Sequence, residues 1–501
     1  MLEKIKNWFK KGGVKLGMVE ELKDITEHPK IAVSKDEVNR IRDNIKHYQS
    51  SYDNVQYTNS EGKSREREFH SLQVPKILAR KLSKLVFNEG VEIAINDDKD
   101  AHSFIEETFK HTKFRKNFGE ELEAAYAIGG LVLRPYYDPG LNQIKISYAR
   151  AGSFFPLNSS SNDISEMAFT TVTTVAEGDK KVHYTLLEMH TWENGSYVID
   201  NELYRSESRD KLGYKVSLNS LEKYKNLQPK SVLKNFTRPL FVHIKLAGKN
   251  NKNLYSPLSL GIIDNSKRQI KDINEKYDQF MWEVKQAERK IIGTEHFFRT
   301  SFNRQTGEPK YNFDSDTTAY RMVKSDEPNI SEFVPSLRSA EFIETINFLL
   351  QIIEIQVGFS AGTFSFDGQS VKTATEIISE NSETYSTRSD NVLIVEEALK
   401  ELVVSIFELA HANNLFTKPS KLDINVDFDD GVFQSQDDKL TFYGRSATLN
   451  LMPQQIAMQR IYGISEKEAK EWVGMIAVEQ GLSDPAEFEN EHDANMFGGL
   501  E

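Results

Sequence analysis

The side chains best suited to chemistry in this sequence are three carboxylates near its C-terminal end, those of Asp427, Asp429 and Asp430. They follow a run of alternating hydrophobic residues, and closely spaced carboxylate oxygens are ligands that divalent cations accept. An acidic strand end followed by a turn explains the same residues without a metal. Both interpretations stay open, and the turn is the one we adopt, so we expect no metal here.

Other catalytic patterns are missing from the sequence. The 11 histidines are scattered, and none has the His-Glu-x-x-His spacing of a helical zinc site. The chain has no cysteine, which excludes thiolate catalysis, cysteine-based zinc sites and disulfides. No Walker-type glycine-rich loop and no Gly-x-Ser-x-Gly motif occur. The sequence therefore predicts a protein that is not an enzyme and that needs no cofactor.

The charge is unevenly placed along the chain. The net charge is −12, of which residues 421–501 carry −10, from 16 acidic and 6 basic side chains. A protein that grips DNA tightly needs a basic footprint, because phosphate neutralisation supplies most non-specific affinity. This balance argues against a strong DNA-binding protein. It fits an acidic C-terminal domain, or a surface that lies near DNA without binding it.

No stretch of the sequence reaches the roughly 18 uninterrupted apolar residues that a membrane span needs. Residues 1–11 alternate apolar and basic side chains and lack the apolar core of a signal peptide. We interpret them as a simple amphipathic helix. Contact with a membrane or with a neighbouring subunit is the alternative, which binding to anionic vesicles would test.

Residues 1–130 read mainly as helix. Ser34 followed by Glu37 predicts a helix start with capping-box spacing. The polar segment 51–67 reads as a surface loop. Residues 72–87 predict a basic amphipathic helix whose charged side is either a solvated face or a nucleic-acid contact. Its basic side chains are those of Lys76, Arg80, Lys81 and Lys84.

The rest of the chain alternates between strands and helices. Short β-type runs separated by Asn, Gly and Asp predict a β-rich domain over residues 130–250. A helix with Pro257 in its first turn is predicted over 256–293, and a second helix over 339–357. Short strands between these helices predict a β-module, which two antiparallel helices would project to one end. A Gly-Ser loop, a long helix, a strand at 422–428 and two or three helices follow.

Several segments of the sequence resemble the portal proteins of tailed phages, in particular phages of Gram-positive bacteria. Residues 256–264 resemble the start of the portal stem, and residues 357–364 with 373–377 are similar to a stretch after the second stem helix. Phe428-Asp429-Asp430 with residues 451–464 matches the C-terminal part of these proteins in style. Residues 127–130 and 154–156 also fit their N-terminal half. Each motif is loose alone, and their order and spacing carry the resemblance.

The resemblance implies an α+β portal fold with a wing, a stem of two long helices, a small β-module called the clip and a mainly helical crown. It places the wing at 1–255, the stem helices at 256–293 and 339–357, and the clip at 294–338. A tunnel-loop region would occupy 358–372, a long wing helix and linker 373–424, and the crown 425–501.

The resemblance also implies a ring-shaped channel at the capsid vertex, through which double-stranded DNA is packaged and ejected without sequence specificity. The expected partners are eleven further copies in a twelve-subunit ring, the terminase large subunit, the head–tail adaptor, and the major capsid and scaffolding proteins. The expected location is the virion, and the host cytoplasm during assembly. The rival interpretations are a phage enzyme, such as a head nuclease or a transferase, and another structural protein of the baseplate or adaptor.

Two groups of residues are candidates for contacts within this function. Every basic contact with DNA would repeat around a ring, so a strongly basic channel lining would retard the DNA. A weakly basic lining would let it slide. The DNA-facing candidates are Gly358, Ser360, Gly362, Thr363, Ser365 and Lys372. The candidates for docking partners at the clip are Arg299, Arg304, Lys310 and Arg321.

Overall fold

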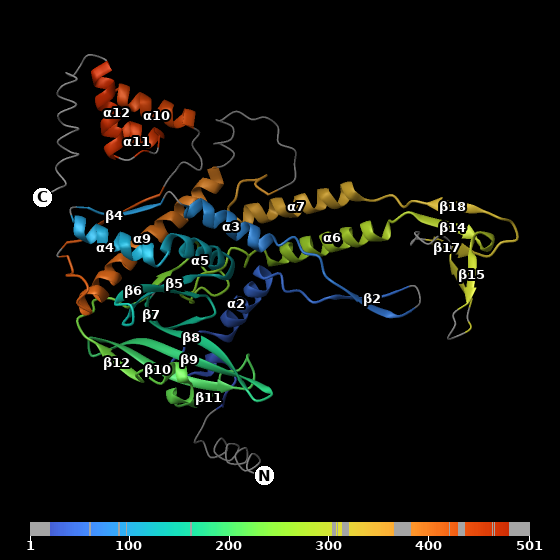
Figure 1. Ribbon diagram of the computed structural model, residues 1–501, viewed down its shortest axis with the longest axis horizontal. Helices are drawn as coiled ribbons and strands as arrows, with labels where there is room; N and C mark the ends of the chain where they lie inside the picture. The colour runs from blue at the N-terminus through green and yellow to red at the C-terminus, as the bar shows by residue number, and fades with distance from the viewer. Residues whose placement is uncertain are drawn as a thin grey trace, which may run out of the picture. The chain divides into compact units, whose positions relative to one another are not determined.

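The computed structural model describes residues 21–59, 62–88, 91–96, 98–160, 163–302, 307, 309–312, 320–364, 382–419, 421–428, 436–462, 464 and 466–479. The chain consists of two compact units, Met1–Asp427 and Phe428–Glu501. Both helices and sheets build the first unit, which confirms the predicted α+β class (Figure 1). Within the described residues, no helix is long and apolar enough to cross a membrane.

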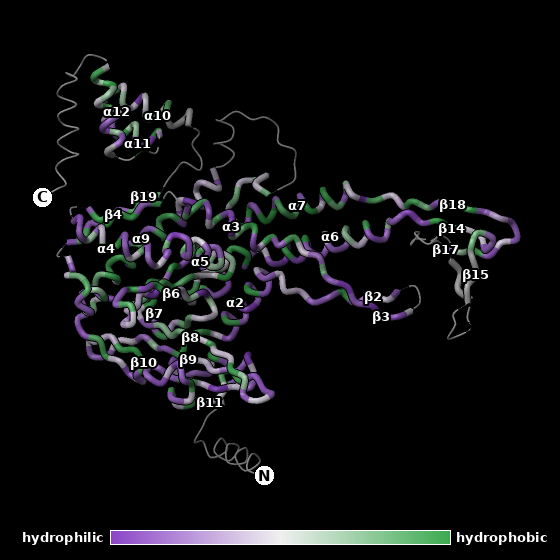
Figure 2. Tube along the Cα trace, viewed as in Figure 1, coloured by the Kyte–Doolittle hydropathy of each residue, from purple (hydrophilic) through white to green (hydrophobic). Residues whose placement is uncertain are grey.

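A twisted antiparallel sheet dominates the middle of the first unit. Its long central strands are β8 (Asp163–Glu177), β9 (Lys180–Glu193) and β10 (Ser196–Ser206), and Asn194-Gly195 forms a tight turn with positive φ at both residues. Hydrophobic and hydrophilic residues intermingle along these strands (Figure 2), as expected for a sheet with one buried face. The sheet is completed by β1 (Glu21–Leu22), β7 (Phe154–Ser160), β11 (Gly213–Val216) and β12 (Lys230–Leu233).

A second, three-stranded sheet lies under the long helix α9 (Ser382–Ala412). Its strand order is β13 (Val242–Ile244), β5 (Leu131–Asp138) and β6 (Gln143–Arg150), all antiparallel. In β13, the half-buried His243 packs against the ring of Phe154, at 5.5 Å between centroids, and its Nε2 atom is shielded from solvent. This sheet and the strands of the larger one confirm the β-rich region predicted for residues 130–250.

Four helices of the N-terminal part cover these sheets. They are α2 (Lys35–Tyr48), α3 (Val74–Val86), α4 (Lys99–His111) and α5 (Phe114–Ile128). The Ser34 hydroxyl accepts a hydrogen bond from the Glu37 amide at 3.3 Å, which confirms the predicted helix start. A two-stranded sheet pairs β4 (Glu92–Asn96) with β19 (Asp423–Asp427), so the strand predicted near 422–428 closes onto the N-terminal part.

We predicted a surface loop for the polar segment 51–67, and this prediction was wrong because the segment forms a β-hairpin. It consists of β2 (Val55–Thr58) and β3 (Ser64–Arg67). Its alternation is hard to see in the sequence because most of its side chains are polar. The hairpin is held by Arg67, which makes two 2.6 Å contacts with the Asp278 carboxylate, and by Tyr57, whose ring lies 5.0 Å from that of Trp282.

Two long helices, α6 (Lys267–Gln286) and α7 (Ser339–Val357), pack side by side in opposite directions (Figure 1). The end of α6 meets the start of α7, because the rings of Phe280 and Phe342 lie 5.2 Å apart and Arg338 donates to Glu283 at 3.2 Å. Beyond this end lie β14 (Lys290–Thr294), β17 (Tyr320–Val323) and β18 (Ile330–Phe333), with β14 in the middle. A separate hairpin pairs β15 (Arg299–Phe302) with β16 (Pro309–Asn312).

The predicted bounds of the first of these helices were wrong at both ends. Residues 256–266 are irregular, because Ser256 bonds to Glu37 of α2, and Ser259 and Ile262 bond to the end of α5, instead of continuing a helix. Residues 290–294 form the central strand β14. The second helix has the predicted bounds, 339–357.

The second unit contains α10 (Gln436–Thr448), α11 (Gln454–Tyr462) and α12 (Glu466–Glu479). Neighbouring helices contact each other in sequence order, and the ring of Tyr462 lies 5.5 Å from that of Trp472, tilted by 57°. These are the helices predicted after the strand. Ser435, Asp429, Asp430 and the acidic tail lie outside the described residues.

Candidate functional site

The most closely fixed polar turn among the candidate residues directly follows α7. Gly358 ends the helix in a left-handed conformation, with φ of 82°, and its amide donates to the Ile355 carbonyl at 3.3 Å. Phe359 then donates to the Glu354 carbonyl at 2.8 Å, which satisfies the last carbonyls of the helix. The Thr387 hydroxyl of α9 donates to the Gly358 carbonyl at 2.6 Å. The turn is therefore attached to α9 as well as to α7.

A buried carboxylate inside α7 shapes the rest of the turn. Glu354 is fully buried, and it accepts the amide protons of Gly362 at 2.8 Å and of Phe364 at 2.5 Å. Three hydrogen bonds join Ser360 and Thr384: the Ser360 amide donates to the Thr384 hydroxyl at 2.9 Å, the Thr384 amide donates to the Ser360 hydroxyl at 3.3 Å, and the two hydroxyl oxygens lie 3.1 Å apart. A buried polar group left without partners costs about 1–3 kcal/mol, so these hydrogen bonds stabilise the turn. The turn over residues 358–364 is thus rigidly built on two helices.

We expect Gly358→Ala to destabilise the protein by about 2–4 kcal/mol. The left-handed backbone alone costs a non-glycine residue roughly 1–2 kcal/mol. In addition, a Cβ at this position would overlap the Thr387 hydroxyl and break its hydrogen bond, which adds on the order of 1–2 kcal/mol. Chemical denaturation of the unmodified protein and of Gly358→Ala measures this loss of stability.

Gly178→Ala is the matched control for this substitution. Gly178 also has positive φ, 63°, but nothing lies within 4 Å of where its Cβ would be. It should lose only the backbone contribution, roughly 1–2 kcal/mol. Equal losses in the two variants would show that the contact with Thr387 contributes nothing.

The structure separates the candidate DNA-facing residues into two groups. Ser360 is buried, and Gly358 contacts Thr387, so these two residues anchor the turn. Gly362 is exposed and Thr363 is half-buried. Ser365 and Lys372 lie outside the described residues. The DNA-facing role stays a prediction, and within the described part of the turn Gly362 and Thr363 are the residues available for it.

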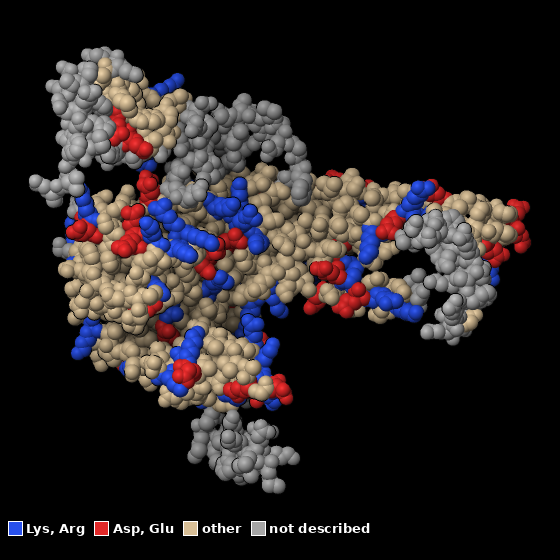
Figure 3. All heavy atoms as spheres, in the orientation of Figure 1, with Lys and Arg blue, Asp and Glu red and all other residues tan. Residues whose placement is uncertain are grey.

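A basic helix face lies close to this turn. Four exposed basic side chains follow one side of α3, which has no acidic residue, and none forms an ion pair with a described residue. The C-terminal end of α3 contacts α9, because the buried Arg388 side chain donates to the Leu85 carbonyl at 2.8 Å. Lys and Arg atoms are prominent over α3 in Figure 3. The four side chains are those of Lys76, Arg80, Lys81 and Lys84.

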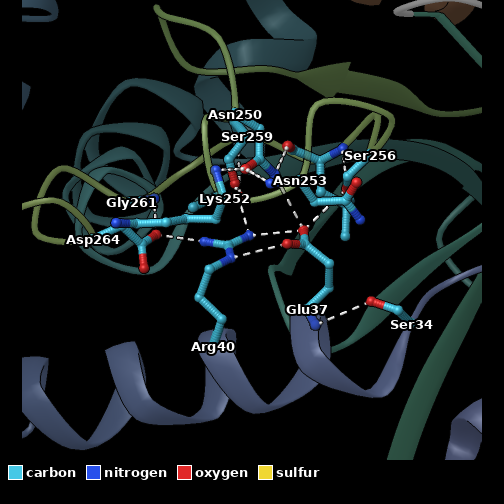
Figure 4. A network of polar contacts seen from close by, with 12 residues as sticks. Ser34, Glu37, Arg40, Asn250, Lys252, Asn253, Ser256, Ser259, Gly261 and Asp264 are labelled. Carbon is cyan, nitrogen blue, oxygen red and sulfur yellow. Dashed lines mark hydrogen bonds and ion pairs between the residues drawn. The ribbon is translucent and has the colours of Figure 1, made fainter.

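A buried polar network fixes the segment that leads into α6 (Figure 4). Arg40 of α2 lies between two carboxylates, those of Glu37 and Asp264, and all three side chains are at most 9% exposed. Glu37 also accepts from the Ser256 hydroxyl at 3.0 Å and from the Asn250 amide at 3.2 Å. The Glu37 carboxylate therefore holds the segment before α6, whereas capping-box spacing had predicted that it would cap its own helix.

The backbone of this segment also touches the end of α5 directly. Ile262 donates to the Tyr126 carbonyl at 2.7 Å, and the Ser259 hydroxyl donates to the Gly129 carbonyl at 3.1 Å. A Cβ at Gly261 would overlap the Ala127 carbonyl oxygen, and one at Gly129 would lie 3.0 Å from the Gly261 nitrogen. Both glycines are thus needed for the close approach of two backbones.

The candidate docking residues fall on different sheets of the β-module. Arg299 in β15 and Lys310 in β16 belong to the same two-stranded hairpin. Arg321 in β17 is exposed and pairs with Ile292 in the other sheet. Arg304 lies outside the described residues. Their docking role stays a prediction.

Among the described residues, no group of three acidic or histidine side chains is placed to hold a metal ion. Asp427 is the C-terminal residue of β19 and faces Glu92 across the strand pair. The other two carboxylates considered from the sequence lie outside the described part of the chain.

Sequence reasoning missed the residues that build the turn and the α6 anchor. Glu354 interrupts the apolar run at the end of α7, and a lone carboxylate in such a run is a usable signal of a buried partner. Thr384 and Thr387 give no such signal, because their partners lie more than twenty residues away. Arg40 looks like an ordinary surface residue of an amphipathic helix.

Comparisons with known proteins identify the family of this chain. Residues 27–481 match the family model described as "Phage portal protein, SPP1 Gp6-like". No curated protein matches the sequence. Among solved structures, a chain described as "Virion of native gene transfer agent (GTA) particle" is similar, with a TM-score of 0.43 and 10% identity over 85% of this chain and 93% of that chain. Because the family model spans most of the sequence, this protein belongs to the SPP1 Gp6-like family of phage portal proteins.

Proposed function

We propose that copies of this chain assemble into a twelve-subunit ring around a channel for double-stranded DNA. As a phage portal protein, the chain is a structural component of the virion and not an enzyme. The observation that carries the ring proposal is the antiparallel pair of α6 and α7, with a β-module at one end and a rigid turn at the other.

The parts of the portal are assigned as follows in this proposal. The helices α6 and α7 form the stem, residues 294–338 the clip, and residues 1–255 with α9 the wing. Helices α10, α11 and α12 belong to the crown. The turn after α7 leads into the tunnel loop, which faces DNA. The basic face of α3 lies near this turn and supports its proximity to a polyanion.

The proposed partners follow from this assignment. The clip docks the terminase large subunit during packaging and the head–tail adaptor afterwards. The major capsid and scaffolding proteins surround the wing, and assembly takes place in the host cytoplasm. Because ATP hydrolysis would belong to the terminase, the portal itself only has to assemble, present a docking edge and let DNA slide.

The test is negative-stain electron microscopy of the purified protein, with its mass in solution. We expect rings with a central hole and a mass near twelve times 57.4 kDa. A stable dimer or trimer without a hole would argue against the ring and favour another structural role in the virion. Rings with a different number of subunits would support the proposed channel and contradict the proposed number of twelve.

A further inference from the structure

We infer that each subunit carries a contact for the phosphate backbone of double-stranded DNA that is separate from the turn after α7. It lies on a surface formed by α3 and by the junction of α4 with α5. This inference rests on the proposed function, because the DNA that the ring passes is the ligand. The surface, called the basic surface below, consists of Lys76, Arg80, Lys81 and Lys84 in α3 and of Lys110, Lys113, Arg115 and Lys116 at the junction.

Positive charge is concentrated here although the chain as a whole is acidic. Residues 72–87 contain four basic and no acidic side chains, and residues 108–119 again contain four basic and no acidic ones. Residues 1–420 together carry only −2, because residues 421–501 account for −10 of the −12 of the chain. The overall charge therefore hides a strongly basic region.

The side chains of the basic surface are available to a ligand. All eight are exposed, and none of them forms an ion pair within the described ranges of the chain. Lys and Arg atoms gather over α3 and between α3 and α4 in Figure 3. Unpaired basic side chains gathered on one face are the electrostatic footprint of a nucleic-acid contact.

The acidic side chains nearby do not cancel this charge. Glu121 pairs with an arginine at the end of β6, and Glu123 accepts from α2 at 2.8 Å. In α9, Glu383 and Asp390 lie on the opposite side of the helix from Arg388, which contacts α3. Among the described residues, four exposed carboxylates border the surface and leave it an excess of four positive charges, those of Glu92, Glu106, Glu107 and Glu120.

The two halves of the basic surface join at the C-terminal end of α3. The ring of Phe87, which ends α3, meets the ring of Phe118 in α5 edge-on, at 4.7 Å between centroids. The Ser83 hydroxyl donates to the Gly119 carbonyl at 3.0 Å. Phe87 also lines a cavity of about 680 Å³, whose wall includes all four basic residues of the junction. Because Arg80 and Phe87 are seven residues apart, they lie on the same side of α3, and the surface continues from the helix into the cavity.

The spacing of the charges in α3 favours DNA over an acidic protein. Lys76, Arg80 and Lys84 recur every four residues, so they form a line of charges about 6 Å apart along the helix. DNA has one charge per about 1.7 Å of its axis, so about seven phosphates face the 12 Å from Lys76 to Lys84. One face of an acidic helix offers a carboxylate only about every 5 Å, or two or three over the same length. Only DNA pairs with every basic side chain of α3 at once.

The contact is distinct from the turn after α7 in its chemistry. Residues 358–364 contain no charged side chain, so this part of the turn has no group that holds phosphate. Contacts from Lys and Arg to phosphates position a protein on DNA without reading its sequence. The basic surface therefore holds DNA of any sequence, while the turn leaves it free to slide.

The experiment measures the affinity of the purified protein for a DNA duplex of random sequence at several salt concentrations. The α3 variant carries four substitutions at exposed positions, Lys76→Gln, Arg80→Gln, Lys81→Gln and Lys84→Gln. We expect its affinity at about 50 mM salt to fall by tenfold or more. The slope of log affinity against log salt should become shallower by about three to four, because each phosphate contact that is lost removes about 0.9.

Two control variants separate this contact from general effects of charge and folding. The first removes one arginine and three lysines from exposed positions around the large sheet and should leave the slope within about one of the unmodified protein. Its substitutions are Lys181→Gln, Arg209→Gln, Lys211→Gln and Lys234→Gln. The second keeps the charge of α3 and should retain both affinity and slope, through Lys76→Arg, Lys81→Arg and Lys84→Arg.

Three outcomes would overturn the inference. The first is an unchanged salt slope in the α3 variant, and the second is an equal loss in the variant of the large sheet. The third is loss of rings in the α3 variant with unchanged DNA affinity, which would assign the basic surface to a contact between copies. If the unmodified protein forms no ring, the proposed function fails, and the salt slopes of its separate subunits still test this contact.

Discussion

Arg40→Met is expected to lower the free energy of unfolding of the first unit by about 3–5 kcal/mol, because breaking a buried ion pair leaves uncompensated charge in the interior. Two carboxylates, those of Glu37 and Asp264, would lose their shared cation at once. Methionine keeps much of the volume, so the loss reports the charge and its hydrogen bonds. Chemical denaturation of purified protein at neutral pH measures it.

Arg42→Met provides the matched control, since Arg42 lies in the same helix and pairs with Asp24 at 3.1 Å while remaining 47% exposed. A surface pair of this kind contributes about 0–1 kcal/mol. A loss for Arg40→Met that is no larger than the loss for Arg42→Met would mean that the segment before α6 is held mainly by its backbone contacts.

Acid should destabilise the protein through His243, by about 2 kcal/mol between pH 7.5 and pH 5. Burial and the nearby Lys245 lower the pKa of His243 from about 6.5 to about 4. Below pH 6.5 the unfolded chain binds a proton that the folded chain cannot bind until about pH 4. Stability is therefore complete above pH 6.5 and is lost as the pH falls toward 4, at about 1.4 kcal/mol per pH unit.

His243→Leu should remove this part of the acid sensitivity, and His296→Leu, at an exposed position, should not. Denaturation midpoints of the three proteins at pH 7.5 and pH 5 measure the effect. Identical pH dependence in the unmodified protein and His243→Leu would show that the His243 imidazole is not the group responsible.

Much of the fold was predictable because its helices and strands carry strong local patterns. The spacing of apolar residues in 342–357 defined α7, and strict alternation defined β19. The start of α6 was not predictable, because the segment 256–266 is apolar enough for a helix. Partners far away in the sequence, among them Glu37 and the end of α5, hold it in an irregular conformation. The β2–β3 hairpin was not predicted for a related reason. It is held by contacts with Asp278 and Trp282, which cannot be inferred from the residues of the hairpin alone.

The position of the turn after α7 could be predicted from the sequence. Which of its residues anchor it and which are exposed could not. Glycine and serine marked a break after α7, and the break is there. Whether Ser360 faces outward or bonds to Thr384 depends on where α9 lies, and no local pattern contains that information. Residues chosen as exposed for their polarity were therefore divided by the structure into anchors and available positions.

The contact between Gly129 and Gly261 has an evolutionary consequence. It is made by main-chain atoms, which every amino acid shares, so neighbouring side chains are free to drift as portal sequences diverge while the joint persists. Only the two glycines are constrained, and they lie more than a hundred residues apart. In distant relatives we expect this pair to be retained together, as a sparse signature of where the long helix pair attaches to the rest of the chain.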